Sequence, residues 1–304
     1  MILFYCTAME ELAKKILTSE RIIHGRINWG KFPDGFPNSF IENVACNVDG
    51  QDVAFLASFD TPAEIFRQLS VIYALPRYGA KSFTIILPYF PTGTMERVER
   101  EGEVATAMTL ARMLSAVECK EASLVIYDIH DLKERFYFRH PIIPKFRSAA
   151  SLFNSARMNG PERFSKAAIC FPDEGAWKRF GKIFDGRHIL CHKDRLWNKR
   201  NVKIIEGDPK GSDVIIVDDL VMTGGTILEC AEVLDRAGVA SVSAYVTHAV
   251  FPKKSCRRMS AFPFANFWVT DSCPETLKDF EYCATNFKIH SLAEPIASML
   301  LGNR

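Results

Sequence analysis

Two adjacent carboxylates follow an apolar run in the second half of the chain. Asp218 and Asp219 come directly after residues 214–217, which read Val-Ile-Ile-Val. Carboxylate oxygens can accept hydrogen bonds from both hydroxyls of a vicinal diol. In open α/β sheets, ligands lie beyond the carboxyl ends of the strands. The pair therefore predicts a binding site for the diol of a sugar.

A loop that contains two glycines follows the acid pair. Its residues are Met222, Thr223, Gly224, Gly225 and Thr226. Glycine lets backbone N–H groups close around a phosphate, and the start of a following helix adds its positive dipole end. Diol and phosphate together indicate a sugar phosphate. The alternative is a tight turn with Thr226 as the helix N-cap and nothing bound.

These residues need a sheet to hold them, and the hydrophobic pattern predicts one. Continuous apolar runs that alternate with helical periodicity indicate parallel strands covered by helices on both faces, which is the α/β class. Two runs, at 124–130 and 214–219, end in polar or acidic residues and suggest two similar halves, with a junction at 139–161. The runs expected as strands are 53–59, 82–90, 124–130, 167–171, 214–217 and 242–250, and the helical stretches are 62–73, 101–116, 176–184 and 226–237.

Composition narrows the class of protein. The 304 residues are 48% apolar and carry a formal charge of +2, which favours neither a nucleic-acid partner nor a membrane surface. No apolar run is long enough to span a bilayer, and the first residues have no signal-peptide pattern. Nine cysteines without a CxxC pair fit a reducing compartment. We therefore expect a cytoplasmic protein that binds neither nucleic acid nor a membrane.

Beyond the loop, motifs along most of the chain resemble those of phosphoribosyl pyrophosphate synthases. They include residues 32–35 (Phe-Pro-Asp-Gly), 42–44, 88–90, 128–130 (Asp-Ile-His), 171–173 (Phe-Pro-Asp) and 193–195 (Lys-Asp-Arg). A phosphoribosyltransferase would need only the second half. The resemblance implies two similar phosphoribosyltransferase-like domains, at 1–144 and 145–304, with the last helix free to pack on the first domain.

The resemblance also implies a reaction. The family transfers the β,γ-diphosphoryl group of MgATP to the 1-hydroxyl of ribose 5-phosphate, which releases AMP and gives 5-phosphoribosyl 1-pyrophosphate. Mg²⁺ is the implied cofactor, and a homo-oligomer with the ATP site near a subunit interface is the implied assembly. Lys193 and Arg195 match the family's catalytic pair, and Asp218 to Thr226 match its ribose 5-phosphate site.

Apart from Asp173, the remaining implied site residues come from the first half of the chain. His130 and Asp173 match metal-binding positions, and Phe32 and Asp34 match positions that contact ATP. Arg97 and Glu99 are expected on the ATP side because Thr94 and Met95 stand where common synthases carry Arg and Gln. Phe36 likewise replaces an acid.

These departures resemble the plant-type, second class of the family. That class is less restricted in its diphosphoryl donor and does not depend on inorganic phosphate, so the resemblance implies both properties here. Two alternatives stay open: a phosphoribosyltransferase, and a non-catalytic subunit associated with true synthases. No GxGxxG follows a strand and no GxxxxGK[ST] occurs, so the sequence gives no support to a dinucleotide or P-loop enzyme.

Overall fold

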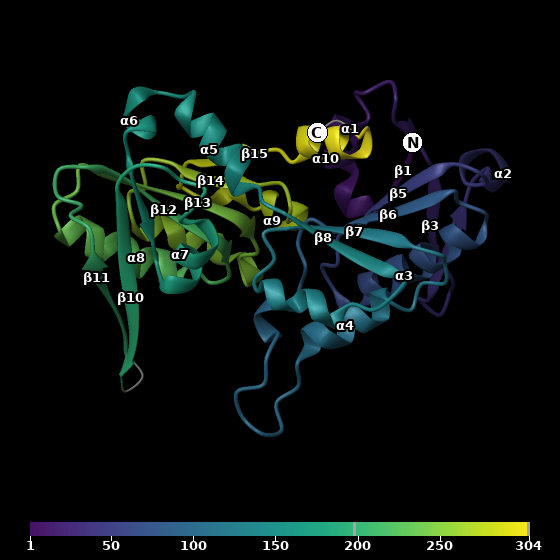
Figure 1. Cartoon of the computed structure of the whole chain (residues 1–304), viewed down its shortest axis with the longest axis horizontal. Helices are drawn as coiled ribbons and strands as arrows, with labels where there is room; N and C mark the ends of the chain where they lie inside the picture. Colours follow the sequence, from purple (N-terminus) through teal and green to yellow (C-terminus); the bar gives the residue numbers. More distant parts are fainter. Residues whose placement is uncertain (197–198, 303–304) are drawn as a thin grey trace. The chain divides into compact units, whose positions relative to one another are not determined.

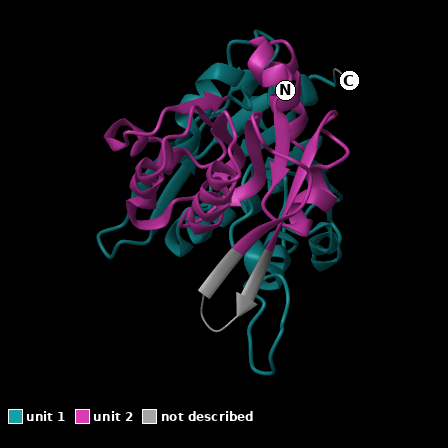
Figure 2. Ribbon diagram, turned by 90° about the vertical axis from the view of Figure 1, so that its left-hand side faces the viewer, with its two compact units in different colours: residues 1–147, 291–304 teal, residues 148–290 magenta. Residues whose placement is uncertain are grey.

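The chain divides into two compact units. The computed structural model describes residues 1–196 and 199–302, and the side chains of 193–201 lie outside the described part (Figure 1). Unit 1 comprises Met1–Arg147 with Ser291–Arg304, and unit 2 comprises Ser148–His290 (Figure 2). This division differs from the expected domain limit of 144 and 145 by three residues. The last helix belongs to unit 1, where it packs against α1.

Unit 1 is built on a six-stranded sheet in which every pairing is parallel, in the order β2-β1-β5-β6-β7-β8. A separate antiparallel hairpin is formed by β3 and β4. The strands are β1 (Ile2–Tyr5), β2 (Ile23–His24), β3 (Ile27–Lys31), β4 (Pro37–Ile41), β5 (Asp52–Leu56), β6 (Ser82–Ile86), β7 (Ala122–Tyr127) and β8 (Ile142–Arg147). The helices are η1 (Thr7–Met9), α1 (Glu10–Ile16), α2 (Val44–Asn47), α3 (Pro62–Arg77), η2 (Gly93–Met95), α4 (Thr106–Leu114), η3 (Leu132–Tyr137) and α10 (Ala293–Leu300).

Unit 2 is built on a seven-stranded sheet in the order β11-β10-β9-β12-β13-β14-β15. Its pairings are parallel except for the antiparallel hairpin of β10 and β11 at one edge. The strands are β9 (Ala168–Phe171), β10 (His188–Leu196), β11 (Lys199–Glu206), β12 (Asp213–Val221), β13 (Ser241–Ala249), β14 (Phe267–Thr270) and β15 (Phe287–His290). The helices are α5 (Ala150–Met158), α6 (Glu162–Ser165), α7 (Glu174–Phe180), α8 (Gly225–Arg236), η4 (Pro252–Ala261), α9 (Pro274–Leu277) and η5 (Phe280–Tyr282).

Hydrophobic packing covers both faces of the unit 2 sheet. On one face, Phe153 of α5 stacks on Tyr245 of β13 with ring centroids 4.2 Å apart, beside Trp268. On the other face, side chains of α8 such as Leu234 pack against Ile216 and its neighbours. Strands buried on both sides read as continuous apolar runs, which explains why the sequence pattern predicted them. The expected α/β class with mainly parallel sheets is confirmed.

The expected elements differ from the observed ones mainly at their ends and at the edges of the sheets. The junction expected at 139–161 contains β8 and α5. The side chains of β8, an edge strand, alternate between more and less exposed positions, so one face of this strand is only partly covered, and this weakens its apolar pattern. Residues 193–196 lie on β10 and residues 199–203 on β11, the two strands of the antiparallel hairpin.

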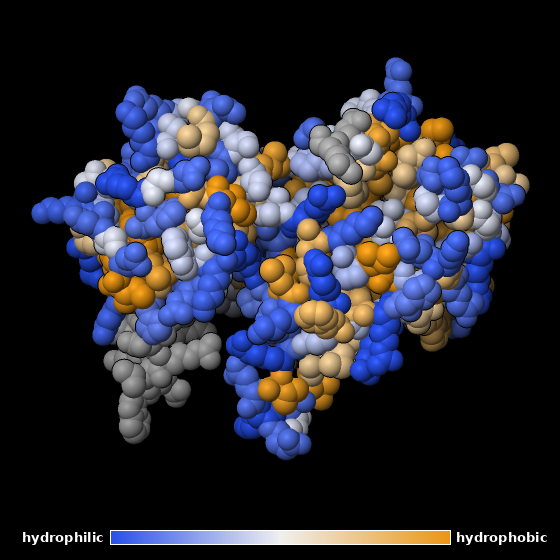
Figure 3. Space-filling model, in the orientation of Figure 1, coloured by the Kyte–Doolittle hydropathy of each residue, from blue (hydrophilic) through white to orange (hydrophobic). Residues whose placement is uncertain are grey.

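Hydrophilic side chains dominate the face of the molecule seen in Figure 3, with smaller hydrophobic patches among them. In the part of the chain that the structure describes, no helix combines the length and apolar character that crossing a membrane requires.

Candidate functional site

The acid pair lies within β12, which continues to Val221 instead of ending at residue 217. Asp219 is buried, and its carboxylate accepts a hydrogen bond of 2.9 Å from Nη1 of Arg179 on α7. The Asp219 backbone N–H donates to Oδ1 of Asp218 at 2.9 Å. The two carboxylates therefore have different surroundings, and Asp219 is the one held by a cation.

Asp218 is only half-buried. Burial raises the pKa of the Asp218 carboxyl well above its usual range, and the negative charges of Asp219 and Asp173 add to the effect. A ligand that donates hydrogen bonds, or a cation, would favour the ionised form of this carboxyl. Asp218 is therefore the member of the pair whose charge a bound ligand can stabilise.

Asp173 follows β9, the parallel neighbour of β12, so its carboxyl lies at the same edge of the sheet. It is the N-cap of α7 and accepts a hydrogen bond of 3.0 Å from the backbone N–H of Ala176. The resemblance implied a metal-binding residue at this position. The structure shows a half-buried capping residue. Capping occupies Oδ1 of the carboxylate and leaves Oδ2 for a ligand.

The loop after β12 has a conformation that requires glycine. Gly224 is the N-cap of α8 with φ +79°, and a Cβ there would lie 1.9 Å from Cε of Met259. Helix α8 begins at Gly225, so Thr226 is its second residue. The alternative in which Thr226 caps the helix is therefore wrong in that detail. The first N–H groups of any helix lack acceptors within the helix, which suits them to an anion.

Helix η4 supports the same loop from outside. The hydroxyl of Ser255 donates to the Met222 carbonyl at 3.1 Å, and Arg258 Nη1 donates to the Thr223 carbonyl at 3.0 Å. The side chains of Met222 and Thr223 are exposed. Sequence reasoning missed Arg179, Ser255 and Arg258, because only the three-dimensional arrangement brings these distant segments beside the acids and the loop.

The predicted catalytic pair lies on β10. In the hairpin, Lys193 pairs with Val202 and Arg195 with Arg200. The side chains of Lys193 and Arg195 lie outside the described residues. The backbone places them on the strand that neighbours β9, beyond the stretch where β10 pairs with β9.

His130 lies in unit 1, in the turn after β7 and not on the strand itself. Its Cβ lies 3.5 Å from the position that a Cβ on Gly93 would take, and a carboxylate oxygen of Glu134 lies equally close to that position. Glu134 is fully buried, and burial raises its pKa to about 7, an effect that His130 partly offsets. Glu134 was not expected here, although it completes a capping box with Asp131.

Phe32 and Asp34 lie in the turn between β3 and β4. Asp34 Oδ1 accepts a hydrogen bond of 3.1 Å from the N–H of Phe36, which closes the turn. The rings of Phe32 and Phe36 are 50% and 62% exposed, and Phe36 meets Phe66 of α3 edge-on at 6.3 Å. These exposed rings at a hairpin tip can stack on a planar ligand or a partner.

Arg97 and Glu99 lie in the segment between η2 and α4. They form an ion pair with each other at 2.9 Å, and both side chains are mostly exposed. The backbone N–H groups of Glu99 and Arg100 donate to the carboxylate of Glu103. The two predicted residues therefore lie together, on a segment that is different from the hairpin that carries Phe32.

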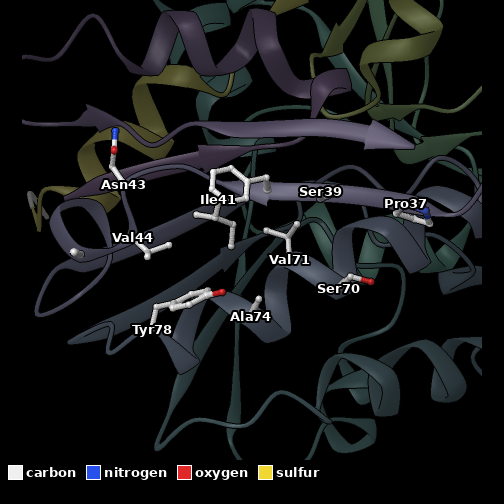
Figure 4. A pocket seen from close by; sticks show the side chains of 11 residues that line it. Pro37, Ser39, Ile41, Asn43, Val44, Ser70, Val71, Ala74 and Tyr78 are labelled. Atoms are coloured by element: carbon white, nitrogen blue, oxygen red, sulfur yellow. The ribbon is translucent and has the colours of Figure 1, made fainter. Parts of the chain in front are cut away.

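A groove of about 470 Å³ lies between the hairpin and α3 in unit 1. Figure 4 shows Ile41 and Val44 on one side of it and Val71, Ala74 and Tyr78 of the α3 region on the other. Of the predicted site residues that the structure describes in unit 1, none lines this groove. In unit 2, by contrast, Asp173, Asp218 and Asp219 lie close to the carboxyl ends of the central strands β9 and β12, a region that we call the unit 2 edge.

Comparisons with known proteins agree with the two-unit fold. Residues 1–117 match the N-terminal domain of ribose phosphate pyrophosphokinase, and residues 192–273 match the phosphoribosyl transferase domain. The fold is also that of phosphoribosylpyrophosphate synthetase from Mycobacterium smegmatis, with a TM-score of 0.84 and 24% identity over 99% of this chain and 97% of that one.

Two plant proteins show closer similarity in sequence. Ribose-phosphate pyrophosphokinase 4 of Oryza sativa subsp. japonica is 51% identical over 98% of this chain and 94% of that protein. Ribose-phosphate pyrophosphokinase 3, chloroplastic, from the same organism is 49% identical over 99% of this chain and 76% of that protein. At this identity and coverage, the chain belongs to the ribose-phosphate pyrophosphokinase family and resembles its plant members.

Proposed function

We propose that this enzyme transfers the β,γ-diphosphoryl group of MgATP to the 1-hydroxyl of ribose 5-phosphate. The observation that carries the proposal is the edge of the unit 2 sheet, where the Asp218–Asp219 pair leads into the glycine loop at the start of α8. Family membership supports the reaction, and the geometry of this edge supports the acceptor.

The sugar phosphate fits the two parts of this edge. The Asp218 carboxylate accepts hydrogen bonds from the ribose diol, while the 2.9 Å contact with Arg179 fixes the Asp219 carboxylate. The first backbone N–H groups of α8 and the hydroxyl of Thr226 hold the 5-phosphate. Gly224 permits the turn that presents these groups, since it has φ +79° and a side chain there would collide with Met259.

Lys193 and Arg195 are proposed to stabilise charge in the transfer. The sugar 1-hydroxyl oxygen forms a bond to the β-phosphorus, the bond between that phosphorus and the oxygen of the α-phosphate breaks, and AMP leaves. The hydroxyl proton is lost to solvent. Negative charge spreads over the phosphoryl oxygens, and an ammonium with a planar guanidinium suits those oxygens.

The donor set at the unit 2 edge fits Mg²⁺, because carboxylate oxygens are the ligands that this ion prefers. Burial, with the charges of Asp219 and Asp173, raises the pKa of Asp218, and a cation would favour its ionised form. We propose Asp173 and His130 as metal-binding residues. Mg²⁺ bound with ATP supplies positive charge to the phosphoryl oxygens.

Phe32, Asp34, Arg97 and Glu99 are proposed to contact ATP. Exposed rings suit stacking on a base, while the Arg97–Glu99 ion pair must open for either residue to bind the nucleotide. With few directional contacts to the base, the site is expected to accept donors other than ATP. Initial rates with ATP, GTP and CTP in phosphate-free buffer test this expectation. An absolute requirement for inorganic phosphate would contradict the resemblance to the second class, whose activity does not depend on phosphate.

A homo-oligomer is also proposed. Phe36, Phe40, Phe66 and Tyr78 expose about half or more of their surface around the hairpin and the groove of unit 1. Exposed aromatic side chains in one region are typical of contacts with a partner. Light scattering should show an assembly that Phe40→Asp weakens. A monomeric wild-type enzyme with full activity would contradict the proposal.

The cytosol is the proposed location, because the odd number of cysteines without paired spacing suits a reducing compartment. A chloroplast form among the plant relatives makes an organelle the alternative. A fluorescent fusion of the full gene product distinguishes the two.

The activity itself has a direct assay. Pure protein is incubated with ribose 5-phosphate, Mg²⁺ and ATP, and the products are identified by mass. AMP together with 5-phosphoribosyl 1-pyrophosphate is expected. ADP with a sugar that has gained a single phosphate would show a different transfer, and no turnover would favour a non-catalytic subunit.

A further inference from the structure

Three cysteines meet in the core of unit 2, beneath the face covered by α8. Cys170 lies on β9, Cys191 on β10 and Cys230 on α8, and all three are fully buried. Among the described residues, this is the one group of three metal-ligand side chains whose donor atoms lie within 4.8 Å of one another. Widely separated sequence positions form the cluster, so cysteine spacing gave no sign of it.

The three sulfur atoms form a nearly equilateral triangle. The Sγ–Sγ distances are 3.7 Å between Cys170 and Cys191, 3.6 Å between Cys170 and Cys230, and 3.7 Å between Cys191 and Cys230. A tetrahedral metal with metal–sulfur bonds of about 2.3 Å separates its sulfur ligands by about 3.8 Å. The triangle therefore needs to expand by only about 0.1–0.2 Å to hold three corners of such a site.

We propose that Cys170, Cys191 and Cys230 form a binding site for a soft divalent cation of the zinc and cadmium type. Thiolates select soft metals, and among the described residues no His, Asp or Glu side chain joins the three cysteines in this cluster. On binding, each sulfur that still carries a proton loses it to solvent as its metal–sulfur bond forms. No oxidant or reductant is needed.

Charge argues for a cation over bare thiolates. The surroundings are apolar and include Ile189, Val202 and Ile216. Such a core disfavours uncompensated thiolates. Burial raises the pKa of the Cys170 thiol well above its usual range, whereas hydrogen bonds from Cys170 and Cys230 lower the pKa of Cys191 to about 4. Without a metal, Cys170 and Cys230 therefore keep their protons. A divalent ion offsets two of the three negative charges, and one small ligand such as water completes a tetrahedral shell.

The position of the cluster gives the site a structural consequence. Cys170 pairs in register with Ile216, two residues before Asp218. Cys191 comes two residues before Lys193 on the same strand, and Cys230 lies in the helix that begins at the glycine loop. A bound cation would therefore tie together β9, which neighbours the acid-bearing β12, the hairpin strand β10, and helix α8, which begins at the glycine loop.

A cadmium titration tests the proposal. Chelator-treated protein is incubated with Cd²⁺ and a phosphine reductant, both as the folded enzyme and during refolding. Thiolate-to-cadmium absorption in the ultraviolet and metal analysis should show about one ion per chain with three sulfur ligands. Melting temperature should rise with the free Cd²⁺ concentration, as for any ligand that binds the folded state.

Variants assign the signal to the cluster. Cys191→Ala and Cys230→Ala each remove a metal ligand. Each should weaken Cd²⁺ binding by more than the roughly 10–100-fold that is lost when a group that only supports a ligand is removed. Circular dichroism confirms that each variant folds. The matched control is Cys283→Ala, because Cys283 and Cys256 form a separate two-sulfur contact at 3.1 Å. This control should bind like wild type.

Two results would overturn the proposal. The first is wild-type protein that takes up no Cd²⁺ even when refolded with it, which would leave three packed thiols. The second is uptake that survives in both cluster variants and disappears in Cys283→Ala, which would assign the metal to the other pair. Neither result depends on catalytic activity.

Discussion

The unit 2 edge and the exposed segments of unit 1 carry the two groups of predicted ligand residues, and they are built differently. At the unit 2 edge, each residue is held: Asp219 by Arg179, Asp173 by the start of α7, and the loop by Ser255 and Arg258. In unit 1, Phe32 lies at a hairpin tip and Arg97 pairs with Glu99 on another segment.

This difference separates a preorganised acceptor site from a donor side that must rearrange. Held side chains lose little conformational freedom when a ligand binds, so their contacts give more net affinity and more geometric precision. Exposed residues lose their conformational freedom only when the ligand binds, which lowers the net affinity of their contacts. We therefore expect substitutions at the unit 2 edge to act strongly and specifically, and substitutions in unit 1 to act weakly.

The largest effect is expected at the catalytic pair. Replacing Lys193 or Arg195 by Ala should lower kcat by about 10²–10³, because the lost cation acts on charge that develops in the transition state. Rapid-quench assays with saturating substrates measure it. A change confined to the KM for ATP would move these residues from catalysis to ground-state binding.

The two acids should respond in opposite ways to the same substitution. Asp219→Asn leaves Arg179 without its charged partner and should cost about 2–4 kcal/mol of unfolding free energy, somewhat less than for a fully buried pair because Arg179 is partly exposed. Asp218→Asn should leave stability unchanged or raise it, since burial and its acidic neighbours already disfavour the charge. Chemical denaturation of both variants gives the comparison, and equal losses would contradict the asymmetry.

Gly224→Ala tests how tightly the loop is packed. Both the positive φ and the contact with Met259 oppose a side chain, so a loss of about 2–3 kcal/mol is expected. Gly211→Ala is the matched control, because Gly211 has φ +68° but nothing within 4 Å of the added Cβ. In a double-mutant cycle, Gly224→Ala should cost no more in the Met259→Ala background than Gly211→Ala does in wild type, because the side chain it would collide with is gone. Met259→Ala alone is the reference, since it removes a buried core side chain. A loss no greater than in the control would show that the loop has room to spare.

A smaller effect concerns Glu134 in unit 1. Burial raises its pKa to about 7, so the folded state holds a proton that the unfolded state releases at lower pH. The resulting stability is present below about pH 4.5 and is lost as the pH rises through 7. Glu134→Gln should flatten the fall in melting temperature between pH 5 and 8 while preserving the acceptor of the Asp131 N–H. An unchanged slope would show that another group titrates.

Local sequence predicted the strand, the acids near its carboxyl end and the glycine turn, because these features are contiguous in the chain. One strand, two acids and a glycine loop occupy residues 214–226, and short-range rules describe all of them. The parallel sheets were predictable for the same reason, since each central strand is a continuous apolar run.

The contacts that hold those residues could not be predicted. Arg179 reaches Asp219 only because β9 and β12 are neighbours in the sheet, and Arg258 reaches the loop across more than thirty residues of chain. The cysteine cluster has the same origin, since two strands and a helix each contribute a single thiol. Strand order, which no local pattern encodes, decides such contacts.

Calorimetry with ribose 5-phosphate alone tests the central claim most directly, because it asks whether the unit 2 edge binds the acceptor without the donor residues. Asp218→Asn should weaken sugar-phosphate binding by about tenfold or more, the usual worth of a hydrogen bond to a charged group, while Phe32→Ala should leave the Kd unchanged. Unchanged binding in Asp218→Asn, or an equal loss in both variants, would contradict the assignment of the acceptor site to this edge.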